Sequence, residues 1–381
     1  MKKTLMVAAL SGVFATAAHA QSSVTLYGLI DAGITYTNNQ HGHSNWQETS
    51  GSINGSRWGL RGAEDLGGGL KAIFTLENGF GINDGTLKQG GREFGRQAFV
   101  GLASDQFGSV TLGRQYDSMV DYVAPLALTG TQYGGTQFAH PLDNDNLNNS
   151  FRVNNAIKFQ SVNYAGFKFG ALYGFSNQAD GFANNRVYSV GTSYGFAGFN
   201  LAAAYLQINN NGNVNAANIN SSGAIASDNT FFAGRQQTWG AGANYTFGPA
   251  TVGLVYTQTN LNSLNAIGAG VSGNSAPQAV GGGQSAQFQN FEGNARYALT
   301  PALSLAGNYT YTRASIQGTH EHWNQVNLQT DYALSKRTDV YLQAEYVTTN
   351  DGGIVAPAIN GLAASATNNQ VAVTAGMRHR F

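Results

Sequence analysis

Basic residues gather in one part of the sequence. Ten of the 20 Lys and Arg residues lie between positions 57 and 168, namely Arg57, Arg61, Lys71, Lys88, Arg92, Arg96, Arg114, Arg152, Lys158 and Lys168. The segment 116–152 has the opposite character, because it carries Asp117, Asp121, Asp143 and Asp145 and no Lys or Arg before Arg152. Fixed charges of two signs that face each other across water act on dissolved ions and polar solutes. The charged residues therefore predict an electrostatic filter.

The elements that must position these charges are β-strands, because apolar and polar residues alternate along the chain after residue 21. Short gaps between alternating segments are followed by long gaps rich in Asn, Gly and Ser, with the long ones at 38–55, 80–92, 116–152, 210–235, 260–287 and 350–369. Sixteen strands are predicted, at 24–37, 56–65, 70–78, 95–103, 109–115, 154–164, 167–176, 186–196, 199–209, 236–247, 250–259, 288–299, 303–315, 322–334, 338–349 and 371–381.

The strand length and the loop asymmetry indicate a membrane-spanning barrel. About ten residues at ~3.3 Å each, tilted by ~45°, reach ~23 Å, close to the ~25 Å apolar band of an outer-membrane barrel. An even strand number places both termini at the short-turn rim, and closure removes exposed sheet edges. The predicted fold is all-β: a 16-stranded antiparallel transmembrane β-barrel with short periplasmic turns and long extracellular loops. Tyr residues at strand ends, such as Tyr205, Tyr256 and Tyr311, are candidates for interfacial girdles.

The alternation also predicts which charges face the lumen. A lipid-facing Arg near the membrane midplane costs about 2–4 kcal/mol, so strand-borne Arg residues should face inward. In the second strand the apolar residues share one face, which leaves Arg57 and Arg61 on the other. The third strand places Lys71 in the same way. In the fourth strand the pattern is ambiguous, so alternation does not place Arg96.

Residues 1–20 have the features of a cleaved secretory signal peptide, with Lys2 and Lys3 before an apolar stretch and an A-x-A site ending at Ala20. The barrel domain is therefore expected to comprise 21–381.

The absence of Cys from the sequence excludes a disulfide scaffold and a thiolate metal site. The charged residues balance and form no basic block, which argues against nucleic-acid binding.

Several stretches resemble trimeric Gram-negative outer-membrane porins, in particular the β-proteobacterial general diffusion type. They are SSVTLYGLIDAGI at 22–34, SRWGLRGAEDLGGGLKAIFTLENGF at 56–80, FGRQAFVGLASDQFGSVTLGRQYD at 94–117 and the alternating C-terminus that ends on Phe381. The likeness covers the whole chain after residue 20. One departure is that 116–152 lacks the Pro-Glu-Phe-Gly-Gly motif of the enterobacterial constriction loop.

This resemblance implies a water-filled channel for the passive diffusion of ions and small hydrophilic solutes across the outer membrane. It implies that the third loop, 116–152, folds into the barrel. It also implies a homotrimer, contact with outer-membrane lipid, and recognition of the C-terminal Phe381 by the barrel-assembly machinery. The implied constriction has a basic ladder of Arg57, Arg96 and Arg152, extended by Arg61, Lys71 and Arg114, opposite Asp117 and Asp121.

Other interpretations remain open at the level of sequence. The Arg residues can instead pair with Asp and Glu simply to hold the loop in place. The barrel can be a plugged adhesion or binding barrel whose long loops engage a host surface or phage, or the chain can be a soluble secreted lectin. No catalytic site, metal site or cofactor is expected, since the G-x-S-x-G match at 191–195 lies inside an alternating strand without the helix that this motif requires.

Overall fold

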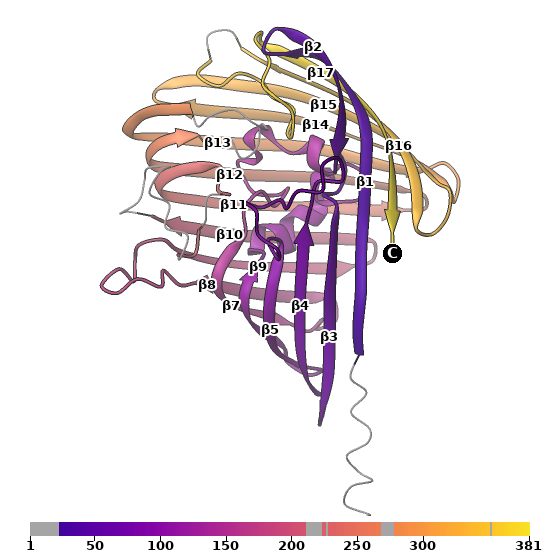
Figure 1. Ribbon diagram of the computed structural model, residues 1–381, viewed down its shortest axis with the longest axis vertical. Helices are drawn as coiled ribbons and strands as arrows, with labels where there is room; N and C mark the ends of the chain where they lie inside the picture. The colour runs from indigo at the N-terminus through magenta and orange to yellow at the C-terminus, as the bar shows by residue number, and fades with distance from the viewer. Residues whose placement is uncertain (1–22, 211–222, 226–227, 268–277, 351–352) are drawn as a thin grey trace, which may run out of the picture.

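The computed structural model describes residues 23–210, 223–225, 228–267, 278–350 and 353–381. The expected signal peptide, residues 1–20, lies outside the described residues. The described part is one antiparallel sheet that closes on itself into a barrel, with short helices inside it (Figure 1). Among the described helices, none is long and apolar enough to cross a membrane.

Seventeen strand segments build the described wall. They are β1 (Ser23–Gln40), β2 (His43–Ser50), β3 (Arg57–Gly67), β4 (Leu70–Gly79), β5 (Gln97–Ser104), β6 (Gly108–Gln115), β7 (Val153–Ser161), β8 (Phe167–Gly174), β9 (Arg186–Phe196), β10 (Phe199–Asn209), β11 (Phe231–Phe247), β12 (Ala250–Ile267), β13 (Gln278–Ala298), β14 (Leu303–Ile316), β15 (Thr319–Ala333), β16 (Thr338–Thr349) and β17 (Asn369–Arg380).

β2 and β3 are two parts of one barrel strand, so the closed wall has sixteen strands, as predicted. Both segments pair with β1, β2 beside its second half and β3 beside its first half. Asp31 of β1 holds the break between them, because its Oδ2 accepts hydrogen bonds from the backbone N–H groups of Ile53 and Asn54 at 3.0 and 2.7 Å. β17 pairs with the other edge of β1 and closes the barrel.

Three predicted loops are shorter than the sequence indicated. The expected loop 38–55 contains β2, and the expected loops 210–235 and 260–287 lose residues to β11, β12 and β13. These strand ends are rich in Gly, Asn, Gln and Ser. Alternation of hydrophobicity reports where a strand meets lipid, and it fades where the same strand continues into water.

The wall is apolar outside and polar inside. Outward side chains such as Leu254 and Leu328 are 71% and 60% exposed, whereas the inward Thr238 and Asn290 are fully buried. Outward aromatic residues form two bands. The upper girdle, near the long loops, comprises Tyr205, Trp239, Tyr256, Phe291 and Tyr311, and the lower girdle, near the short turns, comprises Tyr194, Phe196, Phe199, Tyr245 and Phe247. An apolar outer surface bounded by an aromatic band at each end is typical of a barrel that lies in a bilayer.

The segment between β6 and β7 lies inside the barrel, where Figure 1 shows its short helices surrounded by strands. It contains η1 (Met119–Val123), η2 (Ala124–Leu126), η3 (Leu128–Gly130), η4 (Thr136–Phe138) and η5 (Pro141–Asp143). Met119 and Phe138 are fully buried. The loop crosses the lumen to the far wall, because Gln343 of β16 donates to the backbone oxygen of Gly134 at 2.8 Å. The inward-folded third loop predicted from the sequence is therefore present.

Candidate functional site

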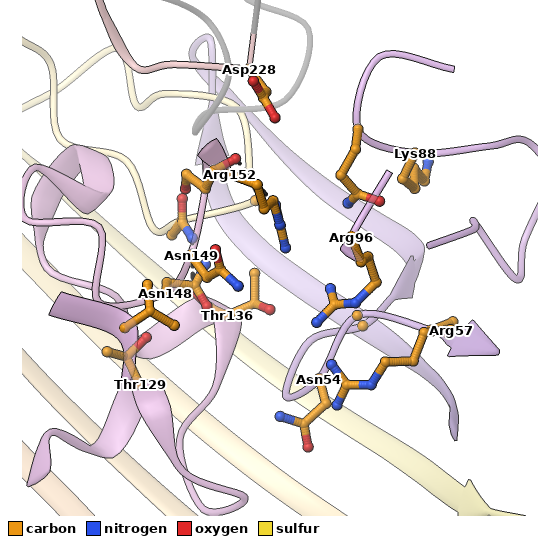
Figure 2. Close-up of a pocket in the computed structure, with 18 of the residues that line it drawn as sticks. Asn54, Arg57, Lys88, Arg96, Thr129, Thr136, Asn148, Asn149, Arg152 and Asp228 are labelled. Carbon is orange, nitrogen blue, oxygen red and sulfur yellow. Dashed lines mark hydrogen bonds between the residues drawn. The ribbon is translucent and has the colours of Figure 1, made fainter. Parts of the chain in front are cut away.

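The inward loop leaves a cavity of about 590 Å³ between itself and the wall that carries β3. Its basic lining residues are Arg57 at the start of β3, Arg96 just before β5, Arg152 just before β7, and Lys88 of the 80–96 connection. Figure 2 shows the guanidinium groups of Arg57, Arg96 and Arg152 directed toward the same space. Residues that are far apart in the sequence thus converge, because Arg57, Arg96 and Arg152 lie at the starts of three strands, β3, β5 and β7, and Lys88 lies in the connection between β4 and β5.

Much of the remaining lining is polar and uncharged. It is contributed mainly by the inward loop and comprises Thr129, Thr136, Asn148, Asn149 and Ser150 (Figure 2). Asn54, in the break between β2 and β3, adds a further amide. Among the described residues that line the cavity, Asp228 is the single acidic one. The site therefore combines positive charge with neutral hydrogen-bonding groups, and in Figure 2 Arg152 lies beside Asn149 of the loop while Asn54 lies beside Arg57.

Arg96 is held by a buried network. Its Nε donates to Glu77 Oε1 at 2.6 Å, and its Nη2 donates to the Tyr116 hydroxyl at 3.1 Å. The Tyr116 hydroxyl donates in turn to Glu77 Oε1 at 3.0 Å, and Tyr27 donates to Glu77 Oε2 at 2.9 Å. A charge-assisted bond with this geometry fixes the guanidinium and offsets its charge.

The positive charges of Arg152 and Arg57 are less fully compensated than that of Arg96. The Arg152 guanidinium lies over the Tyr116 ring, with Cζ 5.8 Å from the ring centroid, and its Nη1 donates to the backbone oxygen of Ser150 at 3.3 Å. Burial, and next the neighbouring Arg96, lower the pKa of Arg152 to about 10, so it stays protonated at neutral pH. Arg57 lies beside Arg96 in the same cavity. These two guanidinium groups supply the positive potential of the site.

Arg114 is buried beside the cavity. Its Nη2 donates to Asp228 Oδ2 at 2.6 Å, and its Nε donates to the backbone oxygen of Gly95 at 2.8 Å. It thereby fixes Asp228 and neutralises the carboxylate that reaches the cavity. Asp228 and Lys88 were not singled out from the sequence, because both lie in connections where alternation gives no orientation.

Arg61 and Lys71 lie away from this cavity. Arg61 faces a smaller groove toward the short-turn rim, where its Cζ is 5.2 Å from the centroid of the Tyr27 ring. Lys71 pairs with Asp105 at 3.0 Å, and both side chains are well exposed. Alternation assigned the face of the strand but carried no information about depth in the channel.

Asp117 and Asp121 also differ from the expected arrangement, because neither lines the cavity with the Arg residues. Asp117 is fully buried, and its carboxylate accepts hydrogen bonds from Met119 N and Asn146 Nδ2, both at 2.7 Å. Burial raises the pKa of Asp117 to about 6. Asp121 pairs with Lys158 at a second cavity of about 850 Å³ that opens toward the short turns. These two carboxylates therefore contact groups of the loop and Lys158 of β7, and no Arg of the predicted basic ladder is paired with either of them.

A buried ionic cluster anchors the far end of the loop. His140 Nδ1 lies 2.6 Å from Asp145 Oδ2, and His140 Nε2 lies 2.9 Å from Glu292 Oε2 of β13. All three side chains are almost completely buried. Burial alone opposes the charged imidazole, but Asp145 and then Glu292 raise the pKa of His140 to about 10. The sequence did not reveal this cluster, since Glu292 is 152 positions away.

Comparisons with known proteins agree with this geometry. A family model described as Gram-negative porin matches residues 5–352. The chain is 32% identical over 413 residues to an outer membrane porin protein of Bordetella pertussis, with all of both chains covered. It is 31% identical over 396 residues to outer membrane porin protein 32 of Delftia acidovorans, again with all of both covered.

A solved structure called an anion-selective porin from Comamonas acidovorans has the same fold. It superposes with a TM-score of 0.73 at 24% identity, over 95% of this chain and all of that one. The lipid-facing barrel wall encloses the inward loop and a polar cavity. The chain therefore belongs to the Gram-negative porins and is a channel of the outer membrane.

Proposed function

We propose that this porin prefers anions, and that Arg57, Arg96, Arg152 and Lys88 set the preference. The observation that carries the proposal is the composition of the 590 Å³ cavity, where four cationic side chains share the lining with neutral amides and hydroxyls of the inward loop. Asp228, the one acidic residue among the described residues of the lining, is neutralised by Arg114 at 2.6 Å. Positive potential in a narrow aqueous passage raises the local anion concentration and lowers that of cations. The channel is passive, and small hydrophilic anions are its expected solutes.

Reversal potentials in planar bilayers test this proposal. In a salt gradient, the channel is expected to show a reversal potential of the sign that anion permeation gives. The variants Arg57→Ser and Arg152→Ser should each reduce this potential, and the double variant should reduce it further than either single variant. Arg337→Ser is the matched control, because Arg337 is exposed in the short turn between β15 and β16 and makes the same change in charge. Unchanged potentials in the double variant would exclude the Arg cluster as the filter.

We further propose a homotrimer whose contact surface includes the outer face of β1, β5 and β6. The outward strand side chains at the short-turn end of these strands are aliphatic, namely Val24, Leu26, Leu102 and Val110. The lower girdle occupies the same end of β9, β10 and β11. Exposed aromatic residues at this end include Phe107, in the short turn between β5 and β6, and the terminal Phe381. An outer face whose strand side chains are mostly aliphatic suits burial against another subunit. Light scattering of the detergent-solubilised protein should give the mass of three chains, and the mass of one chain would contradict the proposal.

We also propose that residues 1–20 are removed on export and that Phe381 is recognised during assembly of the barrel. Removal of residues 1–20 would leave Gln21 first, which the intact mass of the purified protein checks. Recognition of Phe381 by the assembly machinery is supported by the way the C-terminus is fixed: Gly28 N donates to Phe381 O at 3.0 Å, and Phe381 N donates to Gly28 O at 3.1 Å. The Phe381 ring covers Gly28, where a Cβ atom would lie 2.3 Å from Cζ of that ring.

Replacing Gly28 by Val is therefore expected to impair closure of the barrel. The added methyl groups overlap the Phe381 ring and the backbone oxygen of Arg57, which lies 2.8 Å from the Cβ position. The fraction of protein that migrates as a heat-modifiable band should fall severalfold. Gly293→Val is the matched control, since its Cβ would have a nearest neighbour at 3.8 Å on the same outer surface. Equal folding of the two variants would contradict the role of the Phe381–Gly28 contact.

A further inference from the structure

The lumen face of β3, β4 and β5 carries an arginine and two apolar side chains between the constriction and the short turns. Arg61 is opposite Thr75, and Thr75 is opposite Phe99. Opposite residues of an antiparallel pair point to the same face, and Arg61 lies an even number of positions after Arg57, so these side chains face the lumen. Together with Ile73, they line a groove of about 290 Å³.

The apolar side chains of this groove are unusual, because the interior face of an outer-membrane barrel is normally polar. Other inward apolar side chains, such as Leu172 and Leu206, are buried beneath the inward loop in one cluster with Met119. Phe99 and Ile73 are only half-buried, and they belong to none of the buried apolar clusters formed by the described residues. They therefore keep part of their apolar surface in contact with the aqueous lumen.

The Arg61 guanidinium is accessible to a solute in the lumen. Its side chain is exposed, and its Cζ lies 5.2 Å from the centroid of the Tyr27 ring, a contact that orients the group without neutralising it. The nine ion pairs found among the described residues do not include Arg61. Glu77, two positions after Thr75 on β4, already accepts hydrogen bonds from Arg96 and Tyr27.

We propose that this groove is a second anion site, which binds carboxylates whose body is a flat apolar ring. The carboxylate pairs with Arg61, since a guanidinium group binds a carboxylate through two parallel charge-assisted hydrogen bonds. The ring lies against Phe99 and Ile73 and covers their exposed apolar surface. A cavity of about 150 Å³ admits benzene, so the groove has room for one ring with its carboxylate.

This inference rests on the proposed anion preference and narrows it to a class of solute. Arg57 and Arg61 are four positions apart on one face of β3, about 13 Å at ~3.3 Å per residue. An anion that leaves the constriction therefore meets a second cation before it reaches the short-turn rim. Two weak sites in series let a solute enter and leave quickly, as permeation requires. The ring contact favours an aromatic acid over an aliphatic acid of equal charge.

Block of the chloride current in planar bilayers tests the proposal. Benzoate, acetate and benzylammonium are added in turn to both sides of the channel in potassium chloride. Benzoate should halve the chloride conductance at about fivefold lower concentration than acetate, and benzylammonium should not block. Phe99→Ser should abolish the difference between the two acids, and Arg61→Gln should weaken the block by both. Phe247→Ser, on the outer face, and Arg337→Gln, in a short turn, are the matched controls.

Three outcomes would overturn the proposal. They are equal half-blocking concentrations of benzoate and acetate in the wild type, an unchanged difference between them in folded Phe99→Ser, and block by benzylammonium equal to that by benzoate. Folding of each variant is verified by heat-modifiable migration. Failure of the proposed anion filter has a different signature, because it is measured as a reversal potential that does not respond to Arg57→Ser and Arg152→Ser. The preference for benzoate over acetate should persist in those two variants.

Discussion

Replacing His140 by Leu is expected to release the inward loop from the barrel wall. The variant leaves Asp145 and Glu292 facing each other in a fully buried place without the imidazolium between them. Removal of one partner from a buried ionic cluster costs about 3–5 kcal/mol. The wall of the barrel is held by strand pairing and should persist. The loss therefore falls on the docking of 116–152, and the passage should widen and fluctuate.

Single-channel recording measures this effect directly. The His140→Leu channel should have a higher mean conductance and more noise than the wild type, with weaker ion preference, because the neutral wall of the cavity is no longer fixed. His320→Leu is the matched control, since His320 is an exposed residue at the start of β15. A His140→Leu channel that is as quiet and as selective as the control would show that the cluster does not hold the loop.

The same cluster gives a pH dependence with a definite sign. The pKa of His140 is raised from an ordinary 6.5 to about 10 by Asp145 and Glu292, against the effect of burial. Its contribution to docking is therefore complete below about pH 6.5 and is lost as the pH rises through 10. Asp143, whose pKa burial and then Asp145 raise from 3.8 to about 7, also weakens docking as the pH rises, but its change is complete by about pH 7, so the change above pH 7 is that of His140. Channel noise in the wild type should thus increase from pH 7 to pH 10.

Replacing Glu77 by Gln is expected to change ion preference in the opposite direction to the Arg variants. Glu77 is 5% exposed and is the carboxylate that compensates Arg96 at 2.6 Å. Its neutralisation adds one net positive charge below the cavity and loosens Arg96, so anion preference should increase. Loss of the charged acceptor should also cost about 1.5–3 kcal/mol of stability. An amide keeps the shape of the side chain and hydrogen-bonding capacity toward Tyr27.

The reversal potential and the unfolding midpoint in urea check these two expectations separately. Glu48→Gln provides a control with the same change in charge, because Glu48 lies opposite Ile34 on the outer face of the barrel. A decrease of anion preference in Glu77→Gln, comparable with that of Arg152→Ser, would mean that Glu77 positions Arg96 and that position outweighs charge. No change in either quantity would exclude Glu77 from the site.

The sequence predicted the wall far better than its extramembrane ends. The strands β9, β10 and β16 begin and end at the predicted residues 186–196, 199–209 and 338–349. In contrast, β2 was missed, and β11, β12 and β13 extend into segments that were assigned to loops. A lipid-facing strand must alternate, since every second side chain enters hydrocarbon, whereas a strand in water is held by backbone pairing that leaves no such pattern.

The site residues divide along a similar line. Arg57 lines the cavity, as alternation and resemblance both indicated, and Arg96 and Arg152 join it from positions that alternation could not orient. Arg61 and Lys71 occupy the correct face at another depth, and Asp117 and Asp121 are used by the loop itself. Depth depends on the tilt and stagger of all strands together, which no single segment encodes.

The sequence by itself determined that the chain is a closed, lipid-facing β-barrel. It also indicated that the strand-borne basic residues between positions 57 and 168 face the interior. The reason is local: a charged side chain at an outward position of a strand would enter hydrocarbon, and that transfer costs free energy. Only the tertiary structure decided which groups the acidic residues of the inward loop contact. The partners of Asp117, Asp121 and Asp145 are Asn146, Lys158 and His140, respectively. Burying a carboxylate requires a partner, and that partner is chosen by the path of the loop across the lumen. The cavity is consequently lined by arginines together with amides and hydroxyls. Its positive potential therefore arises only when the chain is folded.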